Sequence, residues 1–192
     1  HYRQSYSQSG EDMILDTIFH SSKNGLYVDV GANNPLIQSN THFFYKKGWR
    51  GINIDALPGS MKDFNRLRSA DINLEIPISD KEEVLKYYMF SSSFYNSFCE
   101  EVAIEHKNLL IGIKELLTKP LSFVLDQYLN STEINFLSVD VEGMDLNVLK
   151  SNNWEKYRPK IVLFECFANN NIGLIKENPI CLFLKEKEYS FY

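Results

Sequence analysis

Short apolar runs alternate along the chain with segments in which apolar residues recur at helical intervals. The runs predict strands at residues 26–30, 51–54, 73–78, within 134–143 and within 160–167. Strands that alternate with helices predict an α/β fold with a doubly wound, mostly parallel sheet. Such a sheet binds its ligand at the carboxyl ends of the strands.

The segments between these runs are predicted to be helices and loops. Apolar spacing and capping residues predict helices within residues 10–19, 39–48, 60–69, 120–129, 144–152 and 179–187. Residues 83–90 alternate and predict an additional strand. A polar and aromatic loop follows at residues 91–98, and a helix-like stretch occupies residues 100–110.

Composition indicates one packed domain, because 192 residues with 44% hydrophobic and 14% aromatic residues can bury a real core. The net charge of −5 and the lack of a basic run argue against a nucleic-acid partner. No apolar stretch approaches the roughly 20 residues that a membrane span needs. Cys99, Cys166 and Cys181 form no CxxC pair, which indicates buried thiols in a reducing compartment. We therefore expect a cytoplasmic protein.

The first predicted strand ends in a turn, in the sequence GLYVDVGANNP, where such folds place a cofactor. A dinucleotide site requires G-x-G-x-x-G, so that the backbone can approach a pyrophosphate. Here only Gly31 is present. Asn33 stands at the next glycine position and tolerates positive φ, but the close approach to two phosphates is lost. Asp29, two residues before the glycine, would repel phosphate and would suit an ammonium group.

A second acidic residue, Asp55, ends the next predicted strand, 24 residues after Gly31. An acid at this position can accept hydrogen bonds from both hydroxyls of a ribose. Either Asp29 or Asp55 alone could simply satisfy a strand end. The two acids at this spacing favour a ligand with a ribose, a cationic amine and no pyrophosphate, and S-adenosylmethionine fits that description.

The sequence SVDVEGMD places Asp140 and Glu142 two positions apart at another strand end. If the ligand is S-adenosylmethionine, the reaction would be methyl transfer. Methyl transfer to a hydroxyl requires alignment of donor and acceptor and a base for the hydroxyl proton. A desolvated carboxylate can serve as that base, and we expect Asp140 first and Glu142 second. Two alternatives stay open. The two acids could hold Mg²⁺ with Asp145, although nothing else in the sequence demands a metal, or Glu142 could only stabilise a helix start.

Three further features bear on catalysis or on the acceptor. His42, in the first predicted crossover helix, is an alternative base, but a histidine beside three aromatic residues is more often an edge-of-core residue, which we favour. The loop at residues 91–98 could stack its rings on a sugar and bond its hydroxyls, or it could be an ordinary surface loop. Glu165 ends a predicted strand at the same edge and could contact the acceptor.

Five segments resemble the FkbM family of S-adenosylmethionine-dependent methyltransferases. They are SQSGED, YVDVGANNP, SNTHFFYKKGWRGINIDALP, INFLSVDVEGMDLNVLKSNNW and YRPKIVLFE. The resemblance runs in order from about Ser7 to Phe191. It implies a class I methyltransferase fold, which is Rossmann-like, with a seven-stranded sheet. Its antiparallel strand would lie at or beyond the C-terminus, because the chain stops at Tyr192 in mid-pattern.

The resemblance also implies contacts to S-adenosylmethionine at the residues that match the family's motifs. The methionine end would meet Asp29, Gly31 and Asn33, the ribose Asp55, the adenine Ser79 and Asp80, and the sulfonium Asp140. Ser7, Gln8 and Asp12 would form a lid or contact the methionine end. We assign no metal.

Together these features predict an O-methyltransferase that acts on a hydroxyl of a carbohydrate-like or natural-product acceptor, such as a sugar of a surface polysaccharide. One alternative is a nicotinamide-dependent oxidoreductase, against which the missing glycine pattern counts. The other is a cofactor-binding module that has lost catalysis and serves as a partner subunit, which the presence of Asp140 and Glu142 disfavours.

Overall fold

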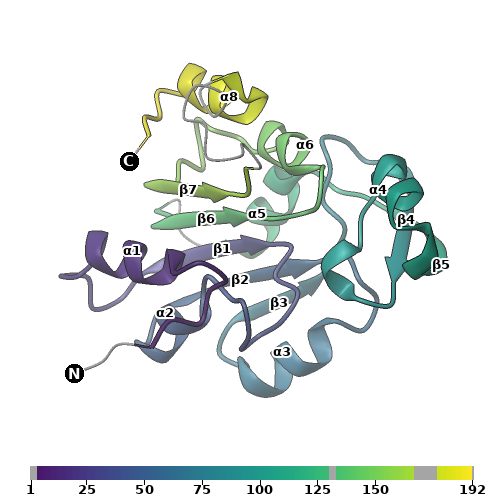
Figure 1. The fold of residues 1–192 in the computed structure, drawn as a ribbon. Coiled ribbons are helices and arrows are strands. Elements are labelled where there is room, and N and C mark those ends of the chain that lie inside the picture. Colours follow the sequence, from purple (N-terminus) through teal and green to yellow (C-terminus); the bar gives the residue numbers. More distant parts are fainter. Residues whose placement is uncertain (1–3, 130–132, 167–176, 192) are drawn as a thin grey trace.

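The computed structural model describes residues 4–129, 133–166 and 177–191. Strands and helices alternate in these residues and form the predicted α/β fold (Figure 1). The strands are β1 (Leu26–Val30), β2 (Arg50–Asp55), β3 (Ile72–Glu75), β4 (Val84–Phe90), β5 (Leu110–Leu117), β6 (Phe136–Val139) and β7 (Ile161–Phe164). The α-helices are α1 (Glu11–Ile18), α2 (His42–Lys46), α3 (Met61–Leu67), α4 (Glu100–Glu105), α5 (Leu121–Tyr128), α6 (Asp145–Lys150) and α8 (Pro179–Glu186). Two 3-10 helices are η1 (Ser93–Tyr95) and η2 (Lys107–Leu109).

The central sheet consists of parallel strands in the order β3-β2-β1-β6-β7. The chain builds outward from β1 to β3, and β6 then pairs with the other edge of β1. Winding therefore changes direction between β1 and β6, and open α/β sheets bind ligands at such a switch point. Within the described residues this sheet has five strands, all parallel, rather than the expected seven. β4 and β5 pair with each other and form a separate two-stranded sheet.

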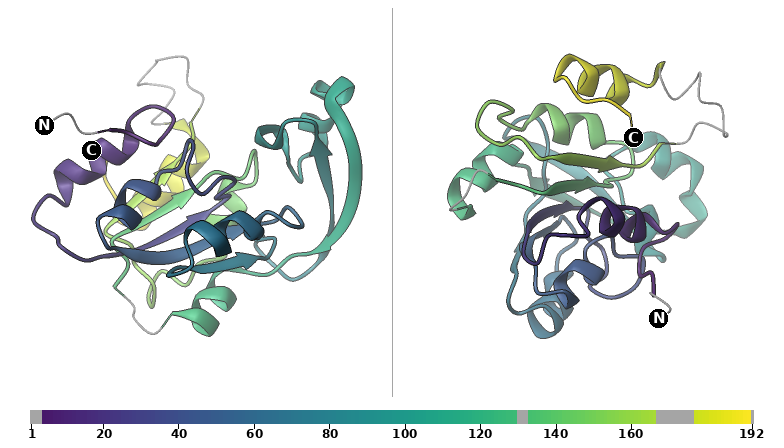
Figure 2. Two further views of the ribbon diagram at one scale, coloured as in Figure 1. Left: turned by 90° about the horizontal axis from the view of Figure 1, so that it is seen from below. Right: turned by 90° about the vertical axis from the view of Figure 1, so that its left-hand side faces the viewer.

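Each face of the sheet has its own apolar cluster, because successive strand side chains point to opposite faces. On one face, Val28 and Val30 of β1 pack with residues of α5, α6 and α8. On the other face, Tyr27 packs with Leu15 of α1 and Phe44 beside Trp49. Helices therefore cover both faces, as the two views of Figure 2 show.

The third strand is shorter than predicted. β3 ends at Glu75 rather than near Ile78. Pro77 follows shortly after and has no N–H to donate, which disfavours continuation of the ladder. Ile78 instead forms an isolated bridge with Lys119.

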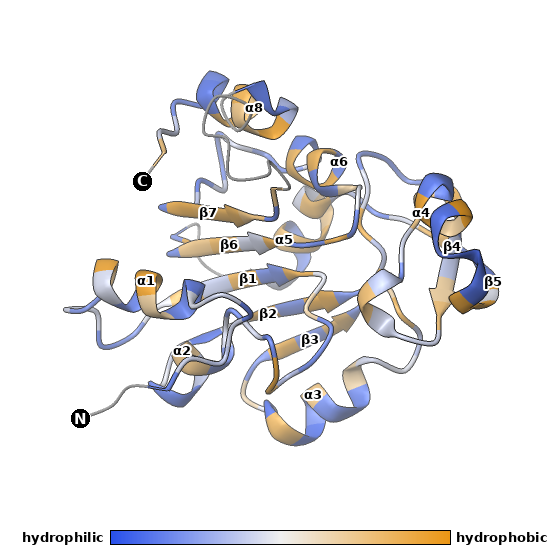
Figure 3. Cartoon of the chain, viewed as in Figure 1, coloured by the Kyte–Doolittle hydropathy of each residue, from blue (hydrophilic) through white to orange (hydrophobic). Residues whose placement is uncertain are grey.

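β4 and β5 form a separate antiparallel pair beyond the carboxyl ends of the parallel strands (Figure 1, Figure 2). We call this pair the hairpin; residues 91–109, which include α4, connect its two strands. β4 confirms the additional strand expected at residues 83–90. β5 was not predicted. The sequence predicted a helix-like stretch at residues 100–110, whereas α4 ends at Glu105 and β5 begins at Leu110. Lys114 and Glu115 are adjacent in β5 and break the alternation by which a strand is recognised. Figure 3 shows both hydrophilic and hydrophobic colours along this hairpin.

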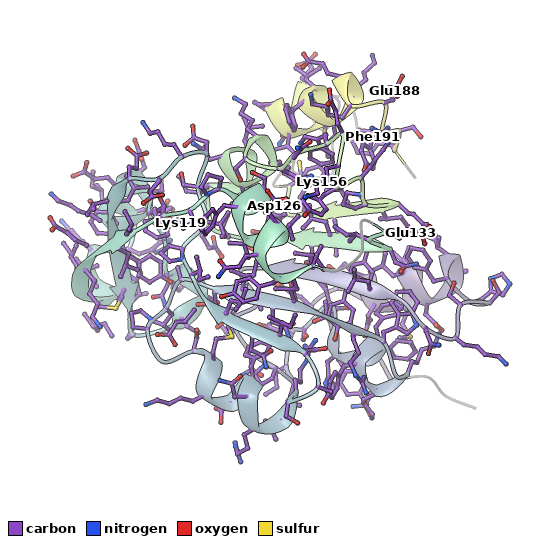
Figure 4. All side chains as sticks on the ribbon, turned by 180° about the vertical axis from the view of Figure 1, so that it is seen from behind. Lys119, Asp126, Glu133, Lys156, Glu188 and Phe191 are labelled. Atoms are coloured by element: carbon purple, nitrogen blue, oxygen red, sulfur yellow. The ribbon has the colours of Figure 1, made fainter. Side chains whose placement is uncertain are left out.

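The opposite side of the molecule carries polar contacts between surface elements. Lys156 and Asp126, both labelled in Figure 4, are joined by a 2.6 Å contact between Nζ and Oδ1. The hydroxyl of Tyr157 donates to the same oxygen at 2.8 Å. These contacts tie α5 to the segment after α6.

The cysteines and helices bear on two expectations from composition. Cys181 is buried, but Cys99 and Cys166 are only half-buried, so the expectation of three buried thiols was wrong for two of them. All three are free. Among the described helices, none combines the length and the apolar character that a membrane crossing requires.

Candidate functional site

A cavity lies at the carboxyl ends of β1, β2 and β6, beside the hairpin. Its empty volume, including the open mouth, is about 930 Å³. The cavity coincides with the switch point of the sheet, where a ligand is expected.

The turn after β1 uses its backbone donors internally. Gly31 N and Ala32 N donate to the oxygen of Ile54 at 2.9 and 3.1 Å. Asn33 N donates to Oδ2 of Asp55 at 2.9 Å. A turn that cradles phosphates needs such N–H groups for its ligand. The geometry therefore agrees with a ligand that has no pyrophosphate.

Gly31 allows the ends of β1 and β6 to approach each other. Its φ is 85°, and a Cβ at this position would lie 1.7 Å from the backbone oxygen of Asp140. Asp140 N in turn donates to the oxygen of Val30 at 2.9 Å. Both backbone conformation and space therefore require glycine here. Asn33 has a φ of 49°, in the left-handed region that asparagine tolerates.

Asp55 lines the cavity at the end of β2, with 9% of its surface exposed. Its Oδ2 accepts from Asn33 N at 2.9 Å, and its Oδ1 accepts from Leu57 N at 2.7 Å. Burial raises the pKa of Asp55, and these backbone N–H groups oppose the rise. An ionised carboxylate has about four acceptor positions, so positions remain for hydroxyl groups of a ligand.

Asp29 reaches the cavity from β1, on the face that α1 and α2 cover, and is 5% exposed. The parallel register sets Ser138 of β6 and Asn53 of β2 beside it. Thr41 Oγ1 donates to its Oδ2 at 2.9 Å. Burial raises the pKa of Asp29, and the Arg68 guanidinium with the hydroxyls of Thr41 and Ser138 opposes that rise. These surroundings suit a ligand group that donates hydrogen bonds.

Asp140, Glu142 and Glu165 bring three carboxyl groups together after β6 and β7. One carboxylate oxygen from each lies within 4.8 Å of the others. Burial and the neighbouring carboxylates raise the pKa of Asp140 and of Glu142 to about 7. Asp140 and Glu142 line the cavity, so near neutral pH this group can both accept and release a proton.

The same carboxylates bear on the Mg²⁺ alternative. Hard cations prefer oxygen ligands, and Glu165 joins Asp140 and Glu142 where we expected Asp145. Asp145 instead accepts a hydrogen bond from Val141 N at 3.2 Å. Acidic groups often cluster without an ion, and we assign no metal.

The N-terminal segment reaches the cavity through Gln8. Asp12 is buried and does not line the cavity. Its carboxylate accepts from Tyr6 N at 2.7 Å and from the hydroxyls of Ser5 and Ser7 at 2.6 and 2.8 Å. Asp12 therefore organises the loop that presents Gln8, rather than facing the cavity itself.

Two expected adenine contacts are not brought to the cavity. Ser79 is buried and Asp80 is exposed, and neither lines it. Ile76 and Ile78 take that place, because β3 ends before Pro77. The wall at this end is therefore apolar.

His42 does not line the cavity either. Its ring packs edge to face against Tyr6, with 4.6 Å between the ring centroids. Burial, together with the charges of Arg68 and Lys46, lowers the pKa of His42. We therefore assign His42 no part in proton transfer.

The loop at residues 91–98 contributes one wall of the cavity. The lining side chains are Ser93, Phe94, Asn96 and Phe98. Ser93 Oγ donates to Oδ1 of Asn33 at 2.8 Å, and Ser97 Oγ donates to the backbone oxygen of Glu142 at 2.6 Å. The loop thus contacts both of the turns that carry the acidic residues.

Several lining residues were missed by sequence reasoning. They are Gln38, Ser39, Asn40, Leu57 and Tyr87. The first three precede α2, and the sequence signal there, a Ser-Asn-Thr run, was interpreted only as a helix cap. No motif or period marks Tyr87, because it belongs to the hairpin rather than to the parallel sheet.

Comparison with known proteins identifies a family. A family model described as "Methyltransferase FkbM domain" matches residues 29–191. The matched region begins at Asp29 and contains Asp55 and Asp140, but not Gln8. No curated protein and no solved structure matched the chain.

Proposed function

The chain belongs to the FkbM methyltransferase family, and on this premise we propose that it is an S-adenosylmethionine-dependent O-methyltransferase. The acceptor would be a hydroxyl of a carbohydrate-like or natural-product molecule. The observation that carries the proposal is that Asp29, Asp55 and Asp140 line one cavity at the switch point of the sheet.

The residues of the cavity fit this cofactor. Asp29 would hold the ammonium group, and Asp55 would accept hydrogen bonds from the ribose hydroxyls. The apolar wall of Ile76 and Ile78 would pack against the adenine. The closed turn after β1 suits a ligand without a pyrophosphate. When bound, the cofactor supplies an activated methyl group.

Asp140 is the proposed base. It lines the cavity in the turn after β6, and burial beside other carboxylates raises its pKa to about 7. A base whose pKa lies near the working pH accepts a proton readily and returns it to solvent. Glu142 has a similarly raised pKa, about 7, and is the second candidate.

The loop at residues 91–98 is the proposed contact for the acceptor. Phe94 and Phe98 offer ring surface, and Ser93 and Asn96 offer polar groups in the same wall. Aromatic rings pack against apolar faces, and hydroxyl and amide groups bond to hydroxyls. A sugar or a hydroxylated natural product presents both kinds of surface.

Calorimetric titration with S-adenosylhomocysteine, the cofactor without its methyl group, tests the first half of the proposal. We expect micromolar binding, about −8 kcal/mol, and none of NADH, which is the matched control. No binding of S-adenosylhomocysteine would contradict the proposed cofactor. Binding of NADH alone would favour an oxidoreductase.

Transfer of a labelled methyl group tests the second half. The acceptors are a panel of saccharides and hydroxylated natural products, each assayed with and without a chelator. We expect a methyl ether as the product. Binding without transfer to any hydroxyl would favour the alternative, a catalytically inactive cofactor-binding module or partner subunit.

A further inference from the structure

A buried network links Arg68 to the cavity without itself lining it. The side chain of Arg68, which follows α3, is completely buried, and its Nε and Nη2 lie 3.0 and 2.9 Å from Oδ2 of Asp71. Nη2 also donates to the hydroxyl of Tyr27 at 2.7 Å, and Nη1 donates to Thr41 Oγ1 at 2.9 Å. Nη1 also donates to Ser39 Oγ at 3.4 Å, but of these two hydroxyls it is Thr41 that donates to Asp29.

Chemistry determines the direction of these hydrogen bonds. A guanidinium group only donates, so the hydroxyl of Thr41 must accept from Arg68. Its single proton can then go to Oδ2 of Asp29, at 2.9 Å, or to Oγ of Ser39, at 3.3 Å. A charge-assisted bond to a carboxylate is stronger than one to a neutral oxygen, which favours Asp29 over other acceptors for that proton.

A second hydroxyl is arranged in the same way. Asn40 Nδ2 donates to Ser138 Oγ at 3.1 Å. Because that oxygen accepts from Asn40, the Ser138 hydroxyl can direct its proton to Asp29, with which it is hydrogen-bonded. Two hydroxyl groups therefore donate to Asp29 from inside the protein, and Asp29 also lines the cavity.

We propose that Arg68 is a positioning residue, which orients the Thr41 hydroxyl and thereby holds Asp29 as an acceptor toward the cavity. The ligand group that this arrangement selects is a cationic donor, such as a primary ammonium, and it rejects a carboxylate, which has no proton to donate. The inference rests on the proposed function, because the ammonium would be that of the cofactor's methionine part. The intervening hydroxyl transmits this orientation without exposing the guanidinium to the cavity.

The charges around Asp29 support this assignment. Burial raises the pKa of Asp29, and Arg68 is the largest opposing influence. Asp55, at the end of β2, adds to the rise, and Asp29 in turn raises the pKa of Asp140, after β6. Arg68 thus offsets negative charge that converges on Asp29 from two neighbouring strands.

The test replaces the connecting hydroxyl rather than the buried guanidinium. Thr41→Val removes the hydroxyl and keeps the shape, and Thr41→Ser retains the hydroxyl. Thr118→Val is the matched control, because Thr118 is equally buried and its hydroxyl lies within hydrogen-bond distance of the backbone oxygens of Lys81 and Glu83, outside the cavity.

The first readout is the affinity for S-adenosylhomocysteine as a function of pH. We expect Thr41→Val to bind roughly tenfold more weakly near neutral pH, since a hydrogen bond to a charged group is lost. When the pH is lowered, the affinity of Thr41→Val should also begin to fall at a higher pH than that of the wild type, because Asp29 protonates more easily without this hydrogen-bond donor. Thr41→Ser and Thr118→Val should keep the wild-type profile. Identical profiles for Thr41→Val and Thr118→Val would overturn the proposal.

Arg68→Lys examines the guanidinium itself. Lysine retains the positive charge but not the planar fork that reaches Asp71, Tyr27 and Thr41 together. We expect Arg68→Lys to show the same dependence of affinity on pH as Thr41→Val. A wild-type profile would show that Arg68 does not position Asp29.

The second readout separates this inference from the proposed function. The titration midpoint of the Asp29 carboxyl carbon is measured by NMR in the free protein, for wild type and for Thr41→Val. A higher midpoint in Thr41→Val supports the proposal, and an unchanged midpoint overturns it, whatever ligand the cavity takes. Failure of the wild type to bind S-adenosylhomocysteine would instead refute the cofactor.

Discussion

The replacement Gly31→Ala tests the close approach of β1 and β6 at the switch point. At a φ of 85°, a residue with a Cβ costs about 1–2 kcal/mol relative to glycine. The new Cβ would also lie 1.7 Å from the backbone oxygen of Asp140, which cannot rotate away as a side chain can. The two turns must separate, and this weakens the hydrogen bond from Asp140 N to Val30 O by about 1 kcal/mol. We expect the free energy of unfolding to fall by about 2–3 kcal/mol, the sum of these two contributions.

Gly48→Ala is the matched control for that variant. Gly48 has a φ of 95°, but no heavy atom lies within 4 Å of its Cβ position. This variant therefore carries only the conformational cost of about 1–2 kcal/mol. Urea denaturation of both variants, followed by the fluorescence of the buried Trp49 and Trp154, measures the difference. An equal loss of stability in the two variants would refute the steric argument at Gly31.

The remaining predictions concern charged groups. Asp140→Asn should lower turnover by about 100-fold or more while cofactor affinity changes by less than about threefold, because the residue would act only on the hydroxyl proton. Enzyme kinetics and calorimetric titration of the variant measure these two changes. Full activity would exclude Asp140 as the base. Burial beside other carboxylates raises the pKa of Asp140 and of Glu142 to about 7, so both bind protons more tightly in the folded state. Their contribution to stability is therefore complete below about pH 4 and is lost as the pH rises through about 7. Between about pH 5 and pH 8 the wild type should lose about 1–3 kcal/mol relative to Asp140→Asn, and a constant difference in denaturation experiments would contradict this. Arg68→Met breaks a fully buried ion pair and should cost about 3–5 kcal/mol. Arg66→Met, whose pair with Asp63 is 70% and 64% exposed, should cost less than about 1 kcal/mol, and equal melting temperatures for the two would refute the distinction.

The strand ends are the part of the site that the sequence predicts best. Asp29, Asp55 and Asp140 each end or follow an apolar run, and parallel strands bring their carboxyl ends to one edge of the sheet. Their convergence on one cavity therefore follows from the alternation of strands and helices. Gly31 and Asn33 could also be identified, because a turn that needs positive φ favours these two residue types.

The contacts that depend on tertiary structure could not be predicted in this way. The resemblance implied adenine contacts at Ser79 and Asp80, at the end of the third predicted strand, but β3 ends before Pro77, and the cavity wall there is made of isoleucines. Arg68 shows the limit most clearly. It lies two positions after the exposed Arg66 in a polar helix sequence, and only the folded positions of Asp71 and Tyr27 make it buried.

The cavity joins two parts of the chain that differ in structural origin. The acidic turns belong to the parallel sheet, whereas the wall proposed for the acceptor belongs to the hairpin, which pairs with none of the sheet's strands among the described residues. Side-chain hydrogen bonds from Ser93 to Asn33 and from Ser97 to Glu142 join the two parts. Because the sheet does not depend on the hairpin for its strand pairing, residues in the loop can change without moving Asp29 or Asp55. Under the proposed function, cofactor binding and acceptor choice could then vary independently, which is how one fold supports several substrates.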